Sequence, residues 1–486
     1  MFQTKRPSKL VSAALAMSCI GVSFLVWGYV ASLAESGHGK SATSNASVSP
    51  AVPALSAPKT NQGAVGSNDA ANVLMNDPFI QNKWGLEKTS ARKAWDVTTG
   101  SKDIIVAVID TGADIHHPDL MQNIWVNPGE AGIIASDACQ KNNAAKGCDR
   151  ATNGIDDDGN GYIDDVHGWD FVHNEGQLID NHGHGSHIAG IIAANGKSGK
   201  GVSGVAPNVS LMILKYYDPK APSTNNLKNT VQAIRYAIKM KAKIINYSGG
   251  GTDYSAEEFA AVKDAEKAGI LFVAAAGNER SNSDEVGKHY YPADYDLTNI
   301  ISVTAVNKED TKVLPSSNYG VRTVDLAAPG ENIFSTLPNN SYGLMTGTSQ
   351  ATAFVTGVAA LVMSLNRDFT AADVKKYILK TGDEYPTLLS KTGTAKLLNS
   401  YRALTSLDKG VSASGVVATN TAGIGASDFA ADKDLKDPKF NTSAMSGSGK
   451  SDEPAESIAM FGRDFLKAMN NGKAKGLDGN TEVKSR

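Results

Sequence analysis

The sequence predicts an α/β fold in which a mostly parallel central sheet is covered by helices on both faces. Five apolar runs lack the alternation of a half-exposed strand and instead suit strands that are buried on both sides. These runs span residues 104–109, 209–214, 243–246, 270–276 and 300–306. Helix-like stretches lie between them at 184–194, 226–240 and 256–268. Strands that alternate with helices in this way are typical of a parallel sheet with a helical layer on each face.

Composition divides the 486 residues into four parts. We expect a signal peptide or membrane anchor at 1–34, a Ser/Ala/Pro-rich linker or short propeptide at 35–75, a compact domain at 76–406 and a low-complexity tail at 407–486. Within the tail, 453–470 has the spacing of a short amphipathic helix. The formal net charge of −3 gives no reason to expect a nucleic-acid partner.

The N-terminus indicates export. Lys5, Arg6 and Lys9 precede an apolar run at 10–30, and a small-residue stretch ends at Ala34. This order is that of a signal peptide cleaved after Ala34, although the run is also long enough to remain as a membrane anchor. In either case we expect the rest of the chain to lie outside the cytoplasm.

Three cysteines are present, and two of them bracket a short polar loop. In an exported chain, Cys139 and Cys148 favour a disulfide over two free thiols. Cys19 lies within the apolar N-terminal run.

A Gly-Thr-Ser turn at 347–349 leads directly into a long apolar helix. This places Ser349 in the first turn, where its hydroxyl is held rigidly and unpaired backbone N–H groups can stabilise negative charge. Those are the requirements of a serine nucleophile. A lone serine at this position is more often an ordinary N-cap, so the assignment depends on its companions.

Three further polar residues follow predicted strands or open a helix. Asp110 ends the first strand, His184 opens the helix after it, and Asn278 follows the fourth strand. In parallel sheets such positions gather at the carboxyl edge. They supply an orienting acid, a general base and an oxyanion donor to Ser349. Taken alone, Asp110 could be an ordinary turn aspartate, His184 a metal ligand and Asn278 an ordinary turn asparagine.

Together these motifs resemble the subtilisin-like serine peptidases, the subtilases. The matching stretches are Asp110-Thr111-Gly112, His184-Gly185-Ser186-His187-Ile188-Ala189-Gly190, Gly277-Asn278 and Gly347-Thr348-Ser349-Gln350-Ala351. The resemblance covers about residues 77–404 and implies a three-layer subtilisin-like fold. It also implies an Asp110, His184 and Ser349 triad with Asn278 in the oxyanion hole.

The same resemblance implies where substrate binds. Asn246 to Gly250, at the end of the predicted strand 243–246, would form an edge to which a peptide adds as a β-strand. The implied pocket for the side chain before the scissile bond is lined by Ser248, Gly249, Gly250, Ala276, Gly277 and Tyr290. Tyr290 stands where the family often has a small residue, so it would fill part of the pocket. The simpler alternative is that Tyr290 turns to the surface.

Structural calcium is the expected cofactor. The loop at 153–165 has the ligand spacing of a calcium-binding loop. The candidate ligands are Asp156, Asp158, Asn160, the Tyr162 carbonyl and Asp164. His167 stands where such loops have a bidentate glutamate, and a merely solvated acidic loop is the alternative. The resemblance implies a second site at Asp77 and Asp119.

The sequence therefore predicts a monomeric, exported serine endopeptidase that hydrolyses protein or peptide substrates through an acyl-enzyme. It would be secreted or extracytoplasmic, and attached to a membrane through residues 10–30 if that run is not removed. The alternative is an inactive binding or surface-adhesion protein of the same fold, stabilised by calcium.

Overall fold

The computed structural model describes residues 83–136, 147–196, 202–221 and 223–406. The predicted signal segment, linker, tail and tail helix lie outside these residues, as do Asp77 and Cys139. Cys148 is buried. Because Cys139 lies outside the described residues, its pairing with Cys148 stays a prediction.

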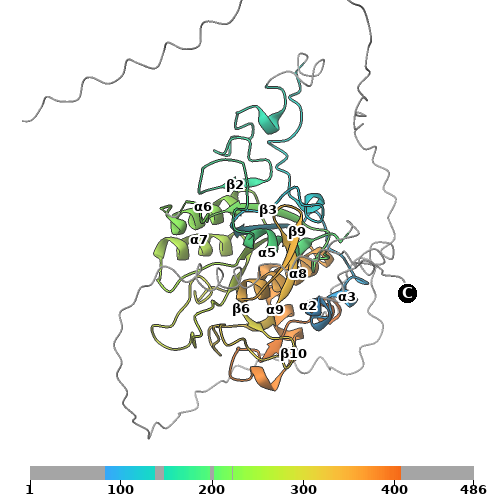
Figure 1. The fold of residues 1–486 in the computed structure, drawn as a ribbon, viewed down its shortest axis with the longest axis vertical. Helices are drawn as coiled ribbons and strands as arrows, with labels where there is room; N and C mark the ends of the chain where they lie inside the picture. Colours follow the sequence, from blue (N-terminus) through green and yellow to red (C-terminus); the bar gives the residue numbers. More distant parts are fainter. Residues whose placement is uncertain (1–82, 137–146, 197–201, 222, 407–486) are drawn as a thin grey trace, which may run out of the picture. The chain divides into compact units, whose positions relative to one another are not determined.

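A nine-stranded sheet forms the centre of the domain, in the order β10-β11-β7-β6-β5-β4-β1-β3-β2. Figure 1 shows the arrangement of strands and helices in the described part of the chain. Every pair is parallel except β10 with β11. The strands are β1 Ile105–Asp110, β2 Gly168–Asp170, β3 Ser210–Lys215, β4 Ile244–Tyr247, β5 Leu271–Ala275, β6 Ile300–Val306, β7 Leu326–Pro329, β10 Asp383–Glu384 and β11 Lys396–Leu397. A separate antiparallel hairpin joins β8 Ile333–Leu337 to β9 Ser341–Met345.

Most of the helices lie between strands along the chain. They are α2 Trp84–Lys88, α3 Ala91–Ala94, α5 His184–Ala193, α6 Asn226–Lys239, α7 Ala256–Lys267, α8 Thr348–Leu365, α9 Ala371–Thr381 and α10 Ser400–Thr405. Short 3-10 turns occur at η2 Met121–Asn123, η3 Arg150–Thr152 and η4 Pro386–Leu388. Side chains cap several N-termini: Asn225 accepts from Lys228 N, and Ser255 accepts from Glu258 N. These caps explain why α6 and α7 begin where they do.

The two faces of the sheet contribute to two separate cores. Val106 and Val108 of β1 belong to the core that contains α5 and α8. Ala107 and Ile109, the alternate residues of the same strand, belong to the core that contains α6 and α7. Because successive side chains of a strand point to opposite faces, the helices form a layer on each side. The predicted three-layer α/β class is confirmed.

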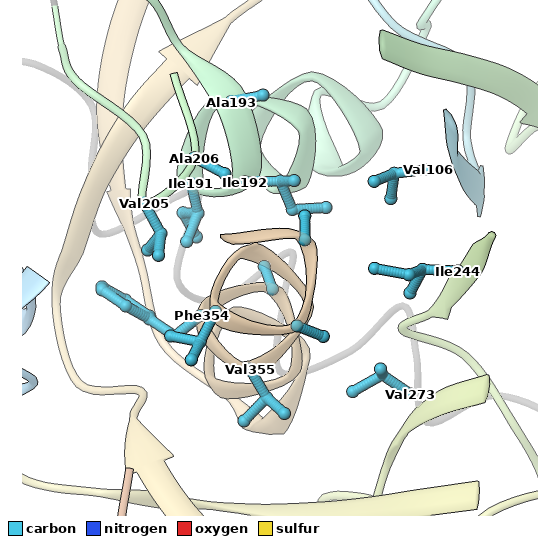
Figure 2. Close-up of a cluster of buried hydrophobic side chains, with 14 of the residues drawn as sticks. Val106, Ile191, Ile192, Ala193, Val205, Ala206, Ile244, Val273, Phe354 and Val355 are labelled. Atoms are coloured by element: carbon cyan, nitrogen blue, oxygen red, sulfur yellow. The ribbon is translucent and has the colours of Figure 1, made fainter. Parts of the chain in front are cut away.

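Helix α8 forms the centre of the first core. Figure 2 shows its Phe354 and Val355 among side chains from α5 and from three strands, namely Ile191, Ile192, Val106, Ile244 and Val273. Small residues let α8 pack closely: a Cβ on Gly357 would lie 2.5 Å from Val205 Cβ. Within the described residues, α8 is the one helix long and apolar enough to cross a membrane, but 89% of its most apolar window is buried, as expected for a core helix.

The five predicted strands and the three helices predicted between them occur, with ends that differ by at most one residue. Strands β2, β7, β10 and β11 were not predicted, and neither was the β8–β9 hairpin. The first four are two to four residues long. Such short strands carry too little periodicity to be recognised. Strand β9 is partly exposed along its whole length.

Candidate active site

The carboxyl edge of the sheet brings the predicted site residues together. Asp110 is the last residue of β1, and Ser248 directly follows β4. Strands β1 and β4 are adjacent, with Ile109 opposite Tyr247. Asn278 follows β5, the next strand along the sheet. Strand β1 pairs with β3 on one side and with β4 on the other, so the strand order reverses at β1. The polar residues lie at this point, which is where ligand sites form in such sheets.

Asp110 and His184 form a buried hydrogen-bonded pair. His184 Nδ1 lies 2.7 Å from Asp110 Oδ1, and the two side chains are 6% and 3% exposed. Thr111 N also donates to Asp110 Oδ1 at 2.8 Å. Because Asp110 engages Nδ1, the opposite ring nitrogen of His184 is the one placed to accept a proton.

Glycine at 185 allows the start of α5 to approach the end of β1. A Cβ at this position would lie 2.0 Å from Gly112 O and 3.2 Å from Asp110 Cβ. Any side chain would push α5 away from Asp110. The glycine beside the general base is thus explained by close packing rather than by flexibility.

Two opposing effects act on the pKa of His184. Burial lowers the pKa, but the charge of Asp110 and its hydrogen bond raise it. Asp180 adds a further electrostatic contribution, and the net result is a pKa above the ordinary histidine value. The neighbouring His187 behaves differently, because burial lowers its pKa to about 3 and its Nε2 lies 2.9 Å from Ile333 O.

Ser349 is the second residue of α8 and is almost completely buried. Its Oγ donates to Ser248 O at 3.0 Å, and Ser248 Oγ donates to Ser349 O at 3.2 Å. These reciprocal bonds fix the first turn of α8 against the end of β4. The serine is therefore held at the carboxyl edge of the sheet, as the sequence predicts.

The Asn278 side chain is anchored on the same turn. Its Oδ1 accepts from Thr348 N at 3.1 Å and from Thr348 Oγ1 at 3.3 Å. With the oxygen engaged by the residue before Ser349, the amide NH₂ is the part of the side chain left to donate to another group. That orientation is the one an oxyanion donor needs.

Tyr290 is buried, with 3% of its surface exposed, so it does not turn to the surface. A Cβ on Gly250 would lie 2.5 Å from Tyr290 Cε1, and a Cβ on Gly277 would lie 2.8 Å from Tyr290 Cδ2. The ring therefore lies against both glycines. Ala276 and Ser248 are also buried. Of the residues that the sequence assigns to the pocket, Gly250 and Gly277 thus lie against the Tyr290 ring.

In the acidic loop after η3, two of the predicted calcium ligands lie close to Glu130, a residue that was not predicted to take part. Ligand oxygens of Asp156, Asp158 and Glu130 all lie within 4.8 Å of one another. Asp164 is directed elsewhere, because its two carboxylate oxygens accept from Gly154 N. Asn160 donates to Asp158 Oδ2 and accepts from Tyr162 N. The sequence could not reveal Glu130, which precedes Asp156 by 26 residues and lies outside the loop.

Asp119, the described half of the second predicted calcium pair, is fully buried. Its Oδ2 accepts from Val202 N and from Tyr342 Oη, each at 2.9 Å. Asp77 lies outside the described residues, so the pairing of the two carboxylates stays a prediction.

Comparison with known proteins identifies relatives over most of the described chain. The model of the subtilase family matches residues 101–403. Thermitase of Thermoactinomyces vulgaris is 34% identical over 333 residues, which cover 68% of this chain and 98% of thermitase. The major intracellular serine protease of Bacillus subtilis is 36% identical over 284 residues, covering 58% of this chain and 76% of that protein.

Other relatives are longer. Subtilisin-like protease 1 of Plasmodium vivax is 30% identical over 355 residues, covering 70% of this chain and 53% of that protein. The chain thus spans about half the length of this relative. Fervidolysin of Fervidobacterium pennivorans, described as a keratinolytic enzyme related to subtilisin, has a solved structure with a TM-score of 0.53 and 25% identity, covering 71% of this chain and 48% of fervidolysin.

Proposed function

The chain belongs to the subtilase family of serine peptidases, and from this premise we propose that it is an exported serine endopeptidase with Asp110, His184 and Ser349 as its triad. The observation that carries the proposal is the 2.7 Å contact between the buried Asp110 and His184 side chains. A histidine held by a buried carboxylate can act as the general base for a serine at the start of a helix, and the serine oxygen then attacks the peptide carbonyl.

Each residue then has one role in the reaction. His184 removes the proton from Ser349 as its Oγ attacks, and later gives that proton to the leaving amine. Asp110 holds the imidazole in the required tautomer and stabilises its protonated form. The Asn278 amide donates to the oxygen that becomes negative in the tetrahedral intermediate.

A serine-directed fluorophosphonate probe tests the proposal directly. The peptidase is expected to react covalently, with mass spectrometry locating the adduct on Ser349, and to cleave an unstructured protein such as casein. A folded protein that neither reacts with the probe nor cleaves the substrate would favour the alternative, an inactive binding or adhesion protein.

Export and processing form a second part of the proposal. Residues 10–30 direct the chain out of the cytoplasm, and cleavage after Ala34 releases it, whereas retention of the run leaves it membrane-attached. Cys139 and Cys148 pair in the oxidising compartment, and the 76–406 domain acts as a monomer on protein or peptide substrates. N-terminal sequencing of the exported protein, with mass analysis before and after reduction, tests the cleavage and the disulfide.

The buried Tyr290 ring leads to a prediction about specificity. Because it lies against Gly250 and Gly277, it takes up volume in the proposed pocket for the side chain before the scissile bond. We expect Ala, Leu or Met to be preferred there over Phe or Tyr. Tyr290→Gly should shift the preference towards Phe and Tyr by about ten-fold or more, since about 1–3 kcal/mol of apolar contact becomes available to the substrate. Cleavage-site profiling on a peptide library measures this shift.

Tyr290→Phe is the matched control, because it removes the hydroxyl and keeps the ring. Its profile should follow the parent protein. If the profiles of Tyr290→Gly and the parent are the same, Tyr290 does not limit the pocket.

Calcium is the proposed structural ion, and the acidic loop fits it. Glu130 is fully buried, and its Oε1 accepts from Asp157 N and Asp158 N. Among the described residues, its other oxygen, Oε2, has no hydrogen-bond partner. A buried carboxylate oxygen without a donor, beside Asp156 and Asp158, is chemically suited to a hard cation that prefers oxygen ligands. Glu130 would then take the place of the glutamate that is missing at His167.

We expect calcium removal to lower the melting temperature and raise autolysis, since an ion that binds only the native state stabilises it by about 2.7 kcal/mol at a hundred times its dissociation constant. Asp156→Ala with Asp158→Ala should remove part of the calcium response, and Glu130→Gln should do the same. Asp77→Ala with Asp119→Ala should remove another part. Melting curves with calcium or chelator measure this, in a Ser349→Ala background that prevents autolysis.

Asp157→Asn is the control for the loop. Its carboxylate lies between the two proposed ligands in sequence, but it accepts from Asn153 Nδ2 and is not part of the acidic group. It should keep the full calcium response. A parent protein whose melting and autolysis do not respond to chelator would refute both sites.

A further inference from the structure

We propose that Asp180 is a positioning residue: its carboxylate ties the loop after β1 to the start of α5 and thereby holds Asp110 and His184 together. The inference rests on the proposed function only for its kinetic consequences. Asp180 lies four residues before His184, in the connection that leads into α5. The hydrogen bonds of its carboxylate go to the residues around the pair, so its positioning effect is exerted through those residues.

Five donors converge on this one carboxylate, which is 7% exposed. Oδ1 accepts from Thr111 Oγ1 at 2.8 Å, from Gly183 N at 2.7 Å and from His182 N at 3.0 Å. Oδ2 accepts from Ser186 N at 2.9 Å and from Ser186 Oγ at 2.7 Å. A buried carboxylate with this many donors is fully satisfied and rigidly held.

The donors come from two segments that are distant in sequence. Thr111 directly follows Asp110, whereas Gly183 and Ser186 lie on either side of His184. Thr111 continues the connection, because its Oγ1 also accepts from Gly185 N at 2.9 Å. The residue after the orienting acid is thus bonded both to Asp180 and to the residue after the general base.

The same carboxylate satisfies the N-terminus of α5. The N-cap residue, Gly183, has no side chain to accept from the first N–H groups of the helix. Asp180 accepts from Gly183 N and Ser186 N in its place, and its negative charge suits this end of the helix dipole. Since His184 is the first residue of α5, whatever fixes the first turn also fixes the imidazole.

Asp180 also contributes to the electrostatic environment of His184. The charged or titratable groups that act on His184 are Asp110 at the end of β1, Asp180 before α5, and His182 and His187 on either side. The two carboxylates raise the pKa of His184, with Asp110 the larger contributor. Loss of the Asp180 charge should therefore lower this pKa.

Asp180→Asn tests the inference because it keeps the shape but replaces one oxygen by a donor. In either orientation the new NH₂ group faces at least one backbone N–H that now has no acceptor. We expect kcat to fall on the order of ten- to a hundred-fold through misplacement of the imidazole, with KM changed by less than about three-fold. A general base must be neutral, so the lower pKa of His184 in Asp180→Asn should move the acid limb of kcat/KM to lower pH.

Thr111 separates the geometric effect from the charge. Thr111→Val removes the bridging hydroxyl without changing any charge, so kcat should fall while the acid limb stays in place. Thr111→Ser keeps the hydroxyl and should restore most of the kcat lost in Thr111→Val. The inference is wrong if Asp180→Asn leaves both kcat and the acid limb of the parent unchanged, or if Thr111→Ser is as impaired as Thr111→Val.

A measurement independent of turnover distinguishes this inference from the proposed function. In the Ser349→Ala background, NMR titration of the imidazole reports the pKa of His184 and the downfield proton of its bond to Asp110. Adding Asp180→Asn should lower that pKa and broaden or shift that proton. An unchanged titration and proton resonance would overturn the positioning role, whether or not the parent hydrolyses peptides.

Discussion

Ser349→Ala should abolish peptide hydrolysis while leaving the domain folded. The acyl-enzyme forms on Ser349 Oγ, and alanine has no atom to replace it. In subtilisin, loss of the serine lowers kcat roughly a million-fold, and we expect a loss of similar size here. Initial rates on a fluorogenic peptide, with the parent protein at matched concentration, measure the effect.

The fold should tolerate this change because little else depends on the hydroxyl. Ser349 Oγ donates one hydrogen bond, to Ser248 O, and its loss costs about 1 kcal/mol. Alanine recovers part of this through its higher helix propensity. The reverse contact, from Ser248 Oγ to Ser349 O, uses the backbone and remains. The variant should thus melt within a few degrees of the parent.

Ser364→Ala provides the matched control. It makes the same substitution on the same helix, and Ser364 Oγ likewise donates to a backbone carbonyl, that of Ala360. It lies near the other end of α8 and should keep parent activity. A Ser349→Ala protein that hydrolyses peptides near the parent rate would end the proposal of a serine nucleophile.

The sequence predicts the fold well where burial leaves a strong pattern. Strands β1, β3, β4, β5 and β6 are apolar throughout because helices cover both faces, and this makes them recognisable without alternation. Strand β2 has three residues and β11 has two, so their pairing depends on neighbours that no local pattern reveals. These two strands form only because β3 and β7 provide an edge to which they pair.

The candidate site was predictable to the extent that it follows from topology. Asp110 and His184 are separated by 74 residues, yet each lies at an element end, and the carboxyl-edge rule places such ends together. Glu130 and Asp180 follow no such rule. Glu130 reaches the acidic loop from a separate turn, and Asp180 resembles an ordinary loop aspartate until its five donors are seen.

Asn278→Ala should lower kcat by about a hundred- to a thousand-fold and leave KM close to that of the parent. A donor to the oxyanion acts on charge that develops in the transition state and is nearly absent in the bound substrate, so its loss raises the barrier rather than weakening binding. Steady-state kinetics that separate kcat from KM measure the effect.

The control must account for the second role of Asn278, whose Oδ1 accepts from Thr348 N and Thr348 Oγ1 beside the nucleophile. Thr348→Val removes the weaker of these two bonds, at 3.3 Å, and keeps the Asn278 amide. If Asn278 acts by donating to the oxyanion, Thr348→Val should lose far less activity than Asn278→Ala. If the two variants lose the same activity, Asn278 acts by fixing the turn before Ser349. If Asn278→Ala stays within a few-fold of the parent kcat, Asn278 has no part in the oxyanion hole, and backbone N–H groups at the start of α8 must stabilise the charge alone.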